Sequence, residues 1–118
     1  MFDGRDPLYV QIADQIRADV LSGALRAEEQ VMSTTQYATT FRINPATAAK
    51  AFTELVDEGV LYKRRGIGMF VAAGAQEKLL AERRQSFFAD VVDPVLEQAR
   101  ILGIGVDEII RRLQEGPR

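Results

Sequence analysis

The sequence contains no cysteine and no histidine, and these absences remove most of the common chemistry of metal and catalytic sites. Without cysteine there is no disulfide framework and no thiolate metal site. Without histidine the chain lacks the most frequent general base and the most frequent metal ligand. Because no clustered carboxylates replace them, we predict no catalytic residues, no metal, no cofactor and no enzymatic activity.

Long apolar runs are also missing. No stretch of about 18 apolar residues occurs, so we expect no transmembrane helix. The first residues, MFDGRDPL, lack the basic and then apolar pattern of a secretory signal. The absence of cysteine is compatible with a cytoplasm. We therefore expect a cytoplasmic protein that does not engage a membrane.

The chain has little excess charge of either sign. The formal net charge is −2, which argues mildly against a nucleic-acid binder. Basic side chains nevertheless outnumber acidic ones between Arg42 and Arg65, and DNA binding requires a local basic face rather than a basic protein.

What is present is a series of short helical patterns. Residues 7–22 have apolar side chains at helical spacing, begin at Pro7 and stop before Gly23. Residues 24–32 have no helical period and predict an extended connection. Ser33 and Gln36 then form a capping-box pattern. The short helix behind it should bury Tyr37, Ala38 and Phe41.

The sharpest helix start in the sequence is Asn44-Pro45, which follows a turn at Arg42-Ile43. Asparagine is a favoured N-cap, and proline is tolerated at the first helical position. The helix should end at Gly59. Its apolar stripe is Ala48, Ala51, Phe52, Leu55 and Val56, and the opposite face is small or cationic, with Ala46, Ala49, Lys50 and Thr53.

Residues 60–71 read as a β-hairpin, with Gly66-Ile67-Gly68 as its turn and Lys63-Arg64-Arg65 at its tip. A boundary of small residues follows at 72–75. Residues 76–102 then predict one long helix kinked at Pro94, and residues 106–113 a final short helix.

This order of elements suits the reading of a DNA groove. A third helix held at a steep angle by the second can enter a major groove with its N-terminal residues at the base edges. Asn44 and Thr47 can hydrogen-bond phosphates or bases, and Lys50 can neutralise a phosphate. Free N–H groups in the first helical turn favour a phosphate. The basic hairpin tip suits the narrow minor groove.

The run RINPATAAKAFTELVDEGVLYKRRGIGMFV resembles the winged-helix signature of the GntR superfamily of bacterial transcription regulators, and PLYVQIADQIRADVLSG resembles its first helix. The INP turn and the short tail resemble its YtrA-like branch. The resemblance implies a homodimer that binds a palindromic operator, usually as a repressor. This sequence differs from the usual family pattern at three positions. Met32 stands where the family usually has Pro, Thr35 where it usually has a DNA-contacting Arg, and Met69 where it often has Thr. The implied DNA contacts are Ser33, Thr34, Thr35, Arg42, Asn44, Pro45, Ala46, Thr47, Lys50, Lys63, Arg64, Arg65 and Gly66.

We therefore predict an α+β fold, with a winged helix-turn-helix DNA-binding domain over residues 1–73 and a helical dimerisation or effector tail over residues 76–118. A segment of about 40 residues generally needs a partner to bury its apolar face, which predicts a homodimer on double-stranded DNA. The expected dimer interface comprises Leu79, Leu80, Phe87, Phe88, Val91, Val95 and Leu102.

Three alternatives remain at this point. A winged helix that binds protein should have an acidic or apolar third-helix face, and an enzyme should have clustered catalytic groups. Within the DNA-binding interpretation, an effector-free regulator competes with a ligand-responsive one. The short tail offers little room for an enclosed pocket of about 300 Å³, although a shallow effector site between two subunits would fit.

Overall fold

The computed structural model describes residues 4 and 6–117 and divides the chain into two compact units, Met1–Leu80 and Ala81–Arg118. Residues 1–3, 5 and 118, which the predicted domains include, lie outside the described residues. The elements are α1 (Leu8–Ser22), β1 (Gln30–Val31), α2 (Thr34–Phe41), α3 (Pro45–Asp57), β2 (Leu61–Arg64), β3 (Gly68–Val71), α4 (Ala75–Phe87), the π-helix η1 (Phe88–Val92), α5 (Asp93–Leu102) and α6 (Val106–Glu115).

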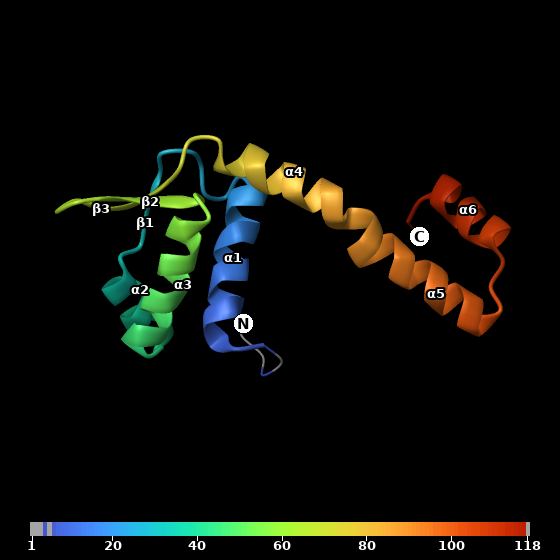
Figure 1. Cartoon of the computed structure of the whole chain (residues 1–118), viewed down its shortest axis with the longest axis horizontal. Helices are drawn as coiled ribbons and strands as arrows, with labels where there is room; N and C mark the ends of the chain where they lie inside the picture. Colours follow the sequence, from blue (N-terminus) through green and yellow to red (C-terminus); the bar gives the residue numbers. More distant parts are fainter. Residues whose placement is uncertain (1–3, 5, 118) are drawn as a thin grey trace. The chain divides into compact units, whose positions relative to one another are not determined.

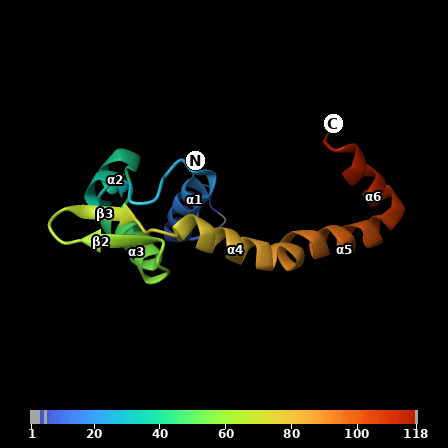
Figure 2. The same ribbon diagram turned by 90° about the horizontal axis from the view of Figure 1, so that it is seen from above.

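The first unit is a winged helix-turn-helix, which confirms the predicted fold class. Helices α1 and α3 lie side by side, and α2 packs against α3 (Figure 1). The strands form an antiparallel sheet in the order β1-β3-β2. The turn between β2 and β3 projects beyond the helices, as Figure 2 also shows, and makes the wing, residues 61–71.

The core of the first unit follows the helical stripes that the sequence shows. Its largest fully buried side chains come from α1, α3 and the sheet region, namely Ile12, Val20, Phe52, Leu55, Val60, Leu61 and Val71. The prediction that Phe41 is buried was wrong, because its side chain is 37% exposed. Phe41 is the last residue of α2 and covers the edge of the core, with its ring 4.5 Å from that of Tyr37.

The predicted extended connection contains a short strand, β1. Gln30 pairs with Phe70 and Val31 with Met69, so β1 adds a third strand along the wing. Val31 is buried, whereas Gln30 is exposed. Two residues are too few to show a period, and the sequence therefore gives no sign of this pairing.

The start of α4 belongs to the first unit. Ala75 and Leu79 are buried in its core, Lys78 Nζ donates a hydrogen bond to the carbonyl oxygen of Glu58, and Gln76 Nε2 donates to that of Leu21 at 3.0 Å. Leu79 was predicted in the dimer interface. Because it is only 3% exposed, it has no surface left for a partner, and that assignment is corrected.

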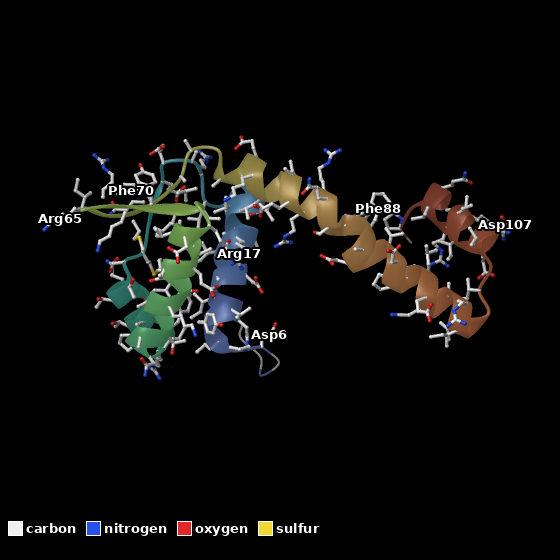
Figure 3. All side chains as sticks on the ribbon, viewed as in Figure 1. Asp6, Arg17, Arg65, Phe70, Phe88 and Asp107 are labelled. Atoms are coloured by element: carbon white, nitrogen blue, oxygen red, sulfur yellow. The ribbon has the colours of Figure 1, made fainter. Side chains whose placement is uncertain are left out.

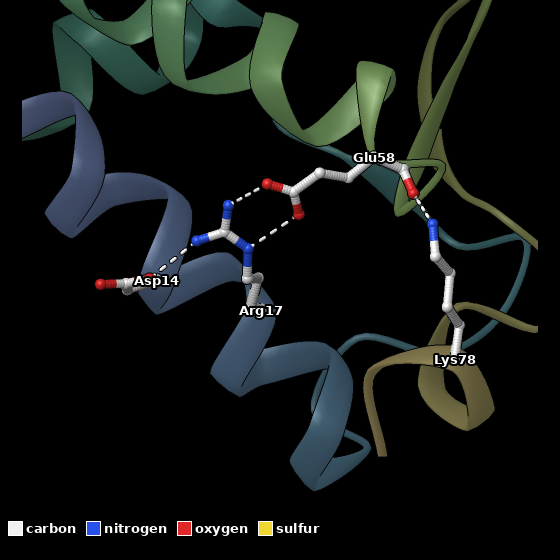
Figure 4. Close-up of polar contacts among 4 residues, drawn as sticks. All are labelled: Asp14, Arg17, Glu58 and Lys78. Atoms are coloured by element: carbon white, nitrogen blue, oxygen red, sulfur yellow. Dashed lines mark hydrogen bonds and ion pairs between the residues drawn. The ribbon is translucent and has the colours of Figure 1, made fainter. Parts of the chain in front are cut away.

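A bidentate ion pair joins α1 to the end of α3 (Figure 4). Arg17 Nε donates to Glu58 Oε2 at 3.0 Å, a second guanidinium nitrogen contacts Glu58 Oε1, and a third contacts Asp14 at 2.7 Å. The hydrogen bond to Glu58 is the main cause that raises the pKa of Arg17. Parallel N–H···O bonds fix an orientation as well as a distance, so this pair sets how α3 lies on α1.

The hydroxyl of Tyr37 is buried and has no hydrogen-bond partner among the described residues. We expect Tyr37→Phe to raise the free energy of unfolding by about 1 kcal/mol, because an unsatisfied buried polar group costs roughly 1–3 kcal/mol. Burial also raises the pKa of Tyr37 above its ordinary 10.0.

The neutral hydroxyl is therefore favoured in the folded chain. The titration of Tyr37 therefore leaves the free energy of unfolding unchanged below the ordinary pKa, and lowers it as the pH rises from there through the raised pKa. Denaturant titrations at neutral and alkaline pH should show a smaller alkaline loss for Tyr37→Phe than for the parent. A destabilised variant at neutral pH would show that the hydroxyl has a partner.

The second unit contains the end of α4, η1, α5 and α6. The predicted continuous helix over residues 76–102 is interrupted by η1, where the N–H of Asp93 reaches the carbonyl of Phe88. Pro94 stands in the first turn of α5, so its missing N–H and its ring fall beside the wider π turn. At the predicted kink, the chain changes from the π-helix η1 to the α-helix α5 just before Pro94.

Most apolar side chains of the second unit are exposed. Ala99 is its one buried hydrophobic residue among those described, whereas Phe88 is 65% and Leu113 75% exposed. None of the helices in the described part of the chain has the length and apolar character needed to cross a membrane.

Candidate nucleic-acid interface

The start of α2 is held by a complete capping box. Gln36 N–H donates to Ser33 Oγ, and Ser33 N–H donates to Gln36 Oε1, each at 3.1 Å. The first-turn N–H groups of Thr34 and Thr35 have no acceptor among the described residues. Thr35 is exposed and Thr34 half-buried. This helix end therefore presents free N–H groups and hydroxyls, which suit a phosphate oxygen.

The turn between α2 and α3 is formed as predicted. Arg42 takes a left-handed conformation with φ 54°, and its N–H donates to the carbonyl of Ala38. Its side chain is exposed. Asn44 caps α3, since its Oδ1 accepts from Ala46 N at 2.8 Å. Asn44 is exposed and keeps its side-chain amide group for an external acceptor.

The start of α3 differs from the sequence prediction in one respect. Pro45 has no N–H, Ala46 N–H is used by the cap, and Thr47 N–H bonds to the Asn44 carbonyl at 3.0 Å. The expected free donors of the first turn are thus occupied at α3. Of the two helices of the helix-turn-helix, α2 is the one with free first-turn donors in the described structure.

The outer face of α3 is small and polar. Pro45, Ala46, Ala49 and Thr53 are exposed, and Thr47 is half-buried. Lys50 is exposed too, but its Nζ lies 4.0 Å from the centroid of the Tyr9 ring on α1. This cation–π contact holds the ammonium against α1, so Lys50 would have to leave it to reach DNA.

The wing presents the predicted basic tip. Lys63, Arg64, Arg65 and Gly66 are all exposed, and Arg65 lies at the end of the hairpin in Figure 3. The turn is closed by Ile67 N–H on the Arg64 carbonyl at 2.9 Å, and Gly66 has φ 76°, which favours glycine. Arg64 lies 5.3 Å from the Phe70 ring centroid.

The cations of this surface have no acidic partners. Among the described residues, no carboxylate lies within ion-pair distance of Arg42, Lys63, Arg64 or Arg65. Two arginines outside this surface are paired, Arg17 with Glu58 and Arg100 with Glu97 at 2.6 Å, whereas Arg26, Arg83 and Arg84 are unpaired in the described structure, like the cations of the wing. The wing and the turn before α3 therefore keep their positive charge for an external anion.

Three residues near this surface were not singled out from the sequence. The ring of Tyr9 forms the cation–π contact with Lys50, while Glu28 and Gln30 contact the wing. Gln30 is the first residue of β1, and Glu28 lies in the turn just before it, with a left-handed φ of 68°. The sequence has no signal for either contact, because each depends on the pairing of β1 with β3.

The predicted dimer residues other than Leu79 are exposed. Phe87 and Phe88 have ring centroids 5.6 Å apart. Within the second unit, an open groove of about 490 Å³ is lined by both apolar and charged residues of α5, α6 and the loop between them: Val95, Ile104, Ile109 and Leu113, with Glu108, Arg111, Arg112 and Glu115. The exposed members of the predicted set are Leu80, Phe87, Phe88, Val91, Val95 and Leu102.

The family described as "Bacterial regulatory proteins, gntR family" matches residues 8–71. The HTH-type transcriptional repressor NagR of Bacillus subtilis is 30% identical over 91% of this chain, which spans 50% of NagR. The HTH-type transcriptional repressor YtrA of the same organism is 26% identical, over 92% of this chain and 83% of YtrA.

Solved structures agree with this match. A transcriptional regulator from Oenococcus oeni aligns with a TM-score of 0.83 and 26% identity, over 98% of this chain and 94% of that one. The DNA-binding domain of AraR in complex with operator ORX1 aligns with a TM-score of 0.57 and 27% identity, over 61% of this chain and 93% of that one.

Proposed function

The chain belongs to the GntR family of bacterial regulatory proteins, and from this premise we propose that it binds a palindromic DNA operator as a homodimer and represses transcription. Its relatives are transcription regulators. The observation that supports DNA as its target is the set of unpaired cations on the wing and on the turn before α3.

The proposed footprint has three parts. The α2 start offers two free N–H groups to a phosphate, the outer face of α3 is small enough to enter a major groove, and Arg65 at the wing tip suits a minor groove. The AraR DNA-binding domain, which was crystallised with an operator, aligns with 61% of this chain. We infer that the equivalent surface here meets double-stranded DNA.

The proposed homodimer rests on the exposed apolar residues of the second unit. Soluble monomers rarely leave contiguous apolar surface of this kind in water, and a two-fold partner would cover it. The division into a DNA-binding head and a dimerisation tail is part of the same proposal. Such a dimer would place two reading surfaces on one duplex, as an inverted repeat requires.

The proposed mode of action is binding without catalysis, in the cytoplasm, where a repressor meets its operator. NagR and YtrA are both named repressors. A dimer bound to the operator would sterically exclude RNA polymerase from that stretch of DNA. An effector site in the groove of the second unit would be shallow and open rather than an enclosed cavity.

Selection of bound sequences from a random pool of duplex DNA tests this function. We expect enrichment of an inverted repeat whose two halves lie on one face of the duplex. The enriched sequence, called the selected duplex below, then serves for all affinity measurements. Failure to enrich any sequence would exclude sequence-specific binding.

We expect Arg65→Ala to weaken binding to the selected duplex. If the guanidinium neutralises one phosphate, the slope of log affinity against log salt should become shallower by about one. Arg26→Ala is the matched control, since Arg26 is exposed in the connection after α1 and its loss changes the net charge equally. Fluorescence anisotropy over a salt series measures both. Equal affinities of the two variants would remove the wing from the footprint.

A further inference from the structure

The segment before α2 contacts the wing through two side chains. Glu28 and Gln30 stand at alternate positions, and the backbone between them is hydrogen-bonded to the end of β3: Glu28 N–H donates to the Val71 carbonyl at 2.8 Å, and Val71 N–H donates to that of Glu29 at 2.9 Å. The segment is therefore anchored by its backbone at the base of the wing.

Gln30 reaches the turn of the wing. Its Nε2 donates a hydrogen bond to the carbonyl oxygen of Ile67 at 3.1 Å. A Cβ on Gly68 would lie 2.6 Å from the same Nε2, so glycine at this position leaves the space that the amide fills. Gln30 thus crosses β3 and holds the residue that follows Arg65 and Gly66.

Glu28 holds the other strand of the hairpin. Its carboxylate accepts a hydrogen bond from the hydroxyl of Tyr62 on β2, which is the main cause that raises the pKa of Tyr62. The Tyr62 ring is stacked on Phe70 with centroids 5.8 Å apart. Glu28 itself has φ 68°, a left-handed conformation that a non-glycine residue adopts at a cost. The surrounding hydrogen bonds keep it there.

We propose that Gln30 is a positioning residue for the wing: it fixes the hairpin turn so that Arg65 is presented to DNA, although Gln30 itself need not touch DNA. This inference rests on the proposed DNA-binding function. A hairpin that projects beyond the helices has few contacts to define its position, and at its turn the contact from outside the wing in the described structure is the amide of Gln30. If the wing tip is already fixed in the free protein, less conformational entropy is lost when it binds DNA.

The first test needs no DNA. Gln30→Met keeps the length of the side chain and removes the donor, and Gln15→Met is the matched control, because Gln15 loses only a local bond to Asp19 within α1. In Gln30→Met we expect the rate of amide hydrogen exchange at residues 64–68 to increase about fivefold, which is the ratio expected for the loss of one ordinary hydrogen bond. In Gln15→Met we expect no change in this rate. Unchanged exchange in the wing would overturn the proposal.

The second test links Gln30 to Arg65 by a double-mutant cycle on the selected duplex. If Gln30 acts through the wing, Arg65→Ala should weaken binding by about tenfold in the parent but less than about twofold in the Gln30→Met background. Fold losses that simply multiply would overturn the positioning role. If the parent chain fails to bind any DNA, the proposed function fails, and the exchange measurement still decides whether Gln30 holds the wing.

Discussion

An Ala49→Glu substitution is expected to abolish binding to the selected duplex, with a loss of more than about 100-fold, while the chain stays folded. Ala49 is exposed on the outer face of α3, so glutamate there meets no core residue, and glutamate is a good helix former. In the proposed complex this face lies in the major groove. A carboxylate brought against phosphates costs several kcal/mol, and its volume keeps the helix out of the groove.

Ala18→Glu is the matched control for this variant. Ala18 is exposed on α1, and the substitution adds the same charge and the same volume to a helix of the same unit. Circular dichroism should show equal helix content in both variants, and anisotropy should show near-parent affinity for Ala18→Glu alone. Strong binding by Ala49→Glu would show that α3 does not enter the groove.

Phe87→Asp is expected to convert a dimer into a monomer and to weaken binding to the selected duplex by two orders of magnitude or more. Phe87 is 47% exposed, so its loss should cost the isolated chain little. In the proposed dimer the same position is buried, and an unpaired carboxylate there costs several kcal/mol. A monomer also loses the avidity of two linked reading surfaces, which is worth roughly 10²–10⁴ in affinity.

Gln85→Asp provides the control on the same helix. Gln85 stands two positions before Phe87, which turns it by about 200° to the opposite side of α4. Sedimentation velocity should show a dimer for Gln85→Asp and a monomer for Phe87→Asp. A Phe87→Asp variant that stays dimeric would move the interface elsewhere. A truncated head for comparison should end after Leu80, because a chain ended near Ala75 would lose Leu79 from the core.

The parts of the fold that the sequence predicts are those set by local chemistry. Ser33 and Gln36 specify the start of α2, and Asn44-Pro45 specifies that of α3, because each cap satisfies a backbone donor within a few residues. The glycine-containing turn of the wing is likewise local. The basic tip and the small outer face of α3 follow directly once these elements are in place.

The parts that the sequence does not predict depend on contacts between distant residues. Leu79 and Leu80 are adjacent and both apolar, so no pattern tells which one faces the core; the structure buries Leu79 and exposes Leu80. Gln30 and the Ile67 carbonyl are brought together only by strand pairing. The ammonium of Lys50 is held by Tyr9 from another helix, which the exposed face of α3 alone does not show.

The proposed function requires that two copies of this chain bind one operator. Sedimentation equilibrium of the chain with the selected duplex, each also measured alone, tests it most directly. We predict a dimer in the absence of DNA and a complex of two chains on one duplex at saturation. A monomer that binds the duplex as a single chain, with no second copy at micromolar concentration, would contradict it.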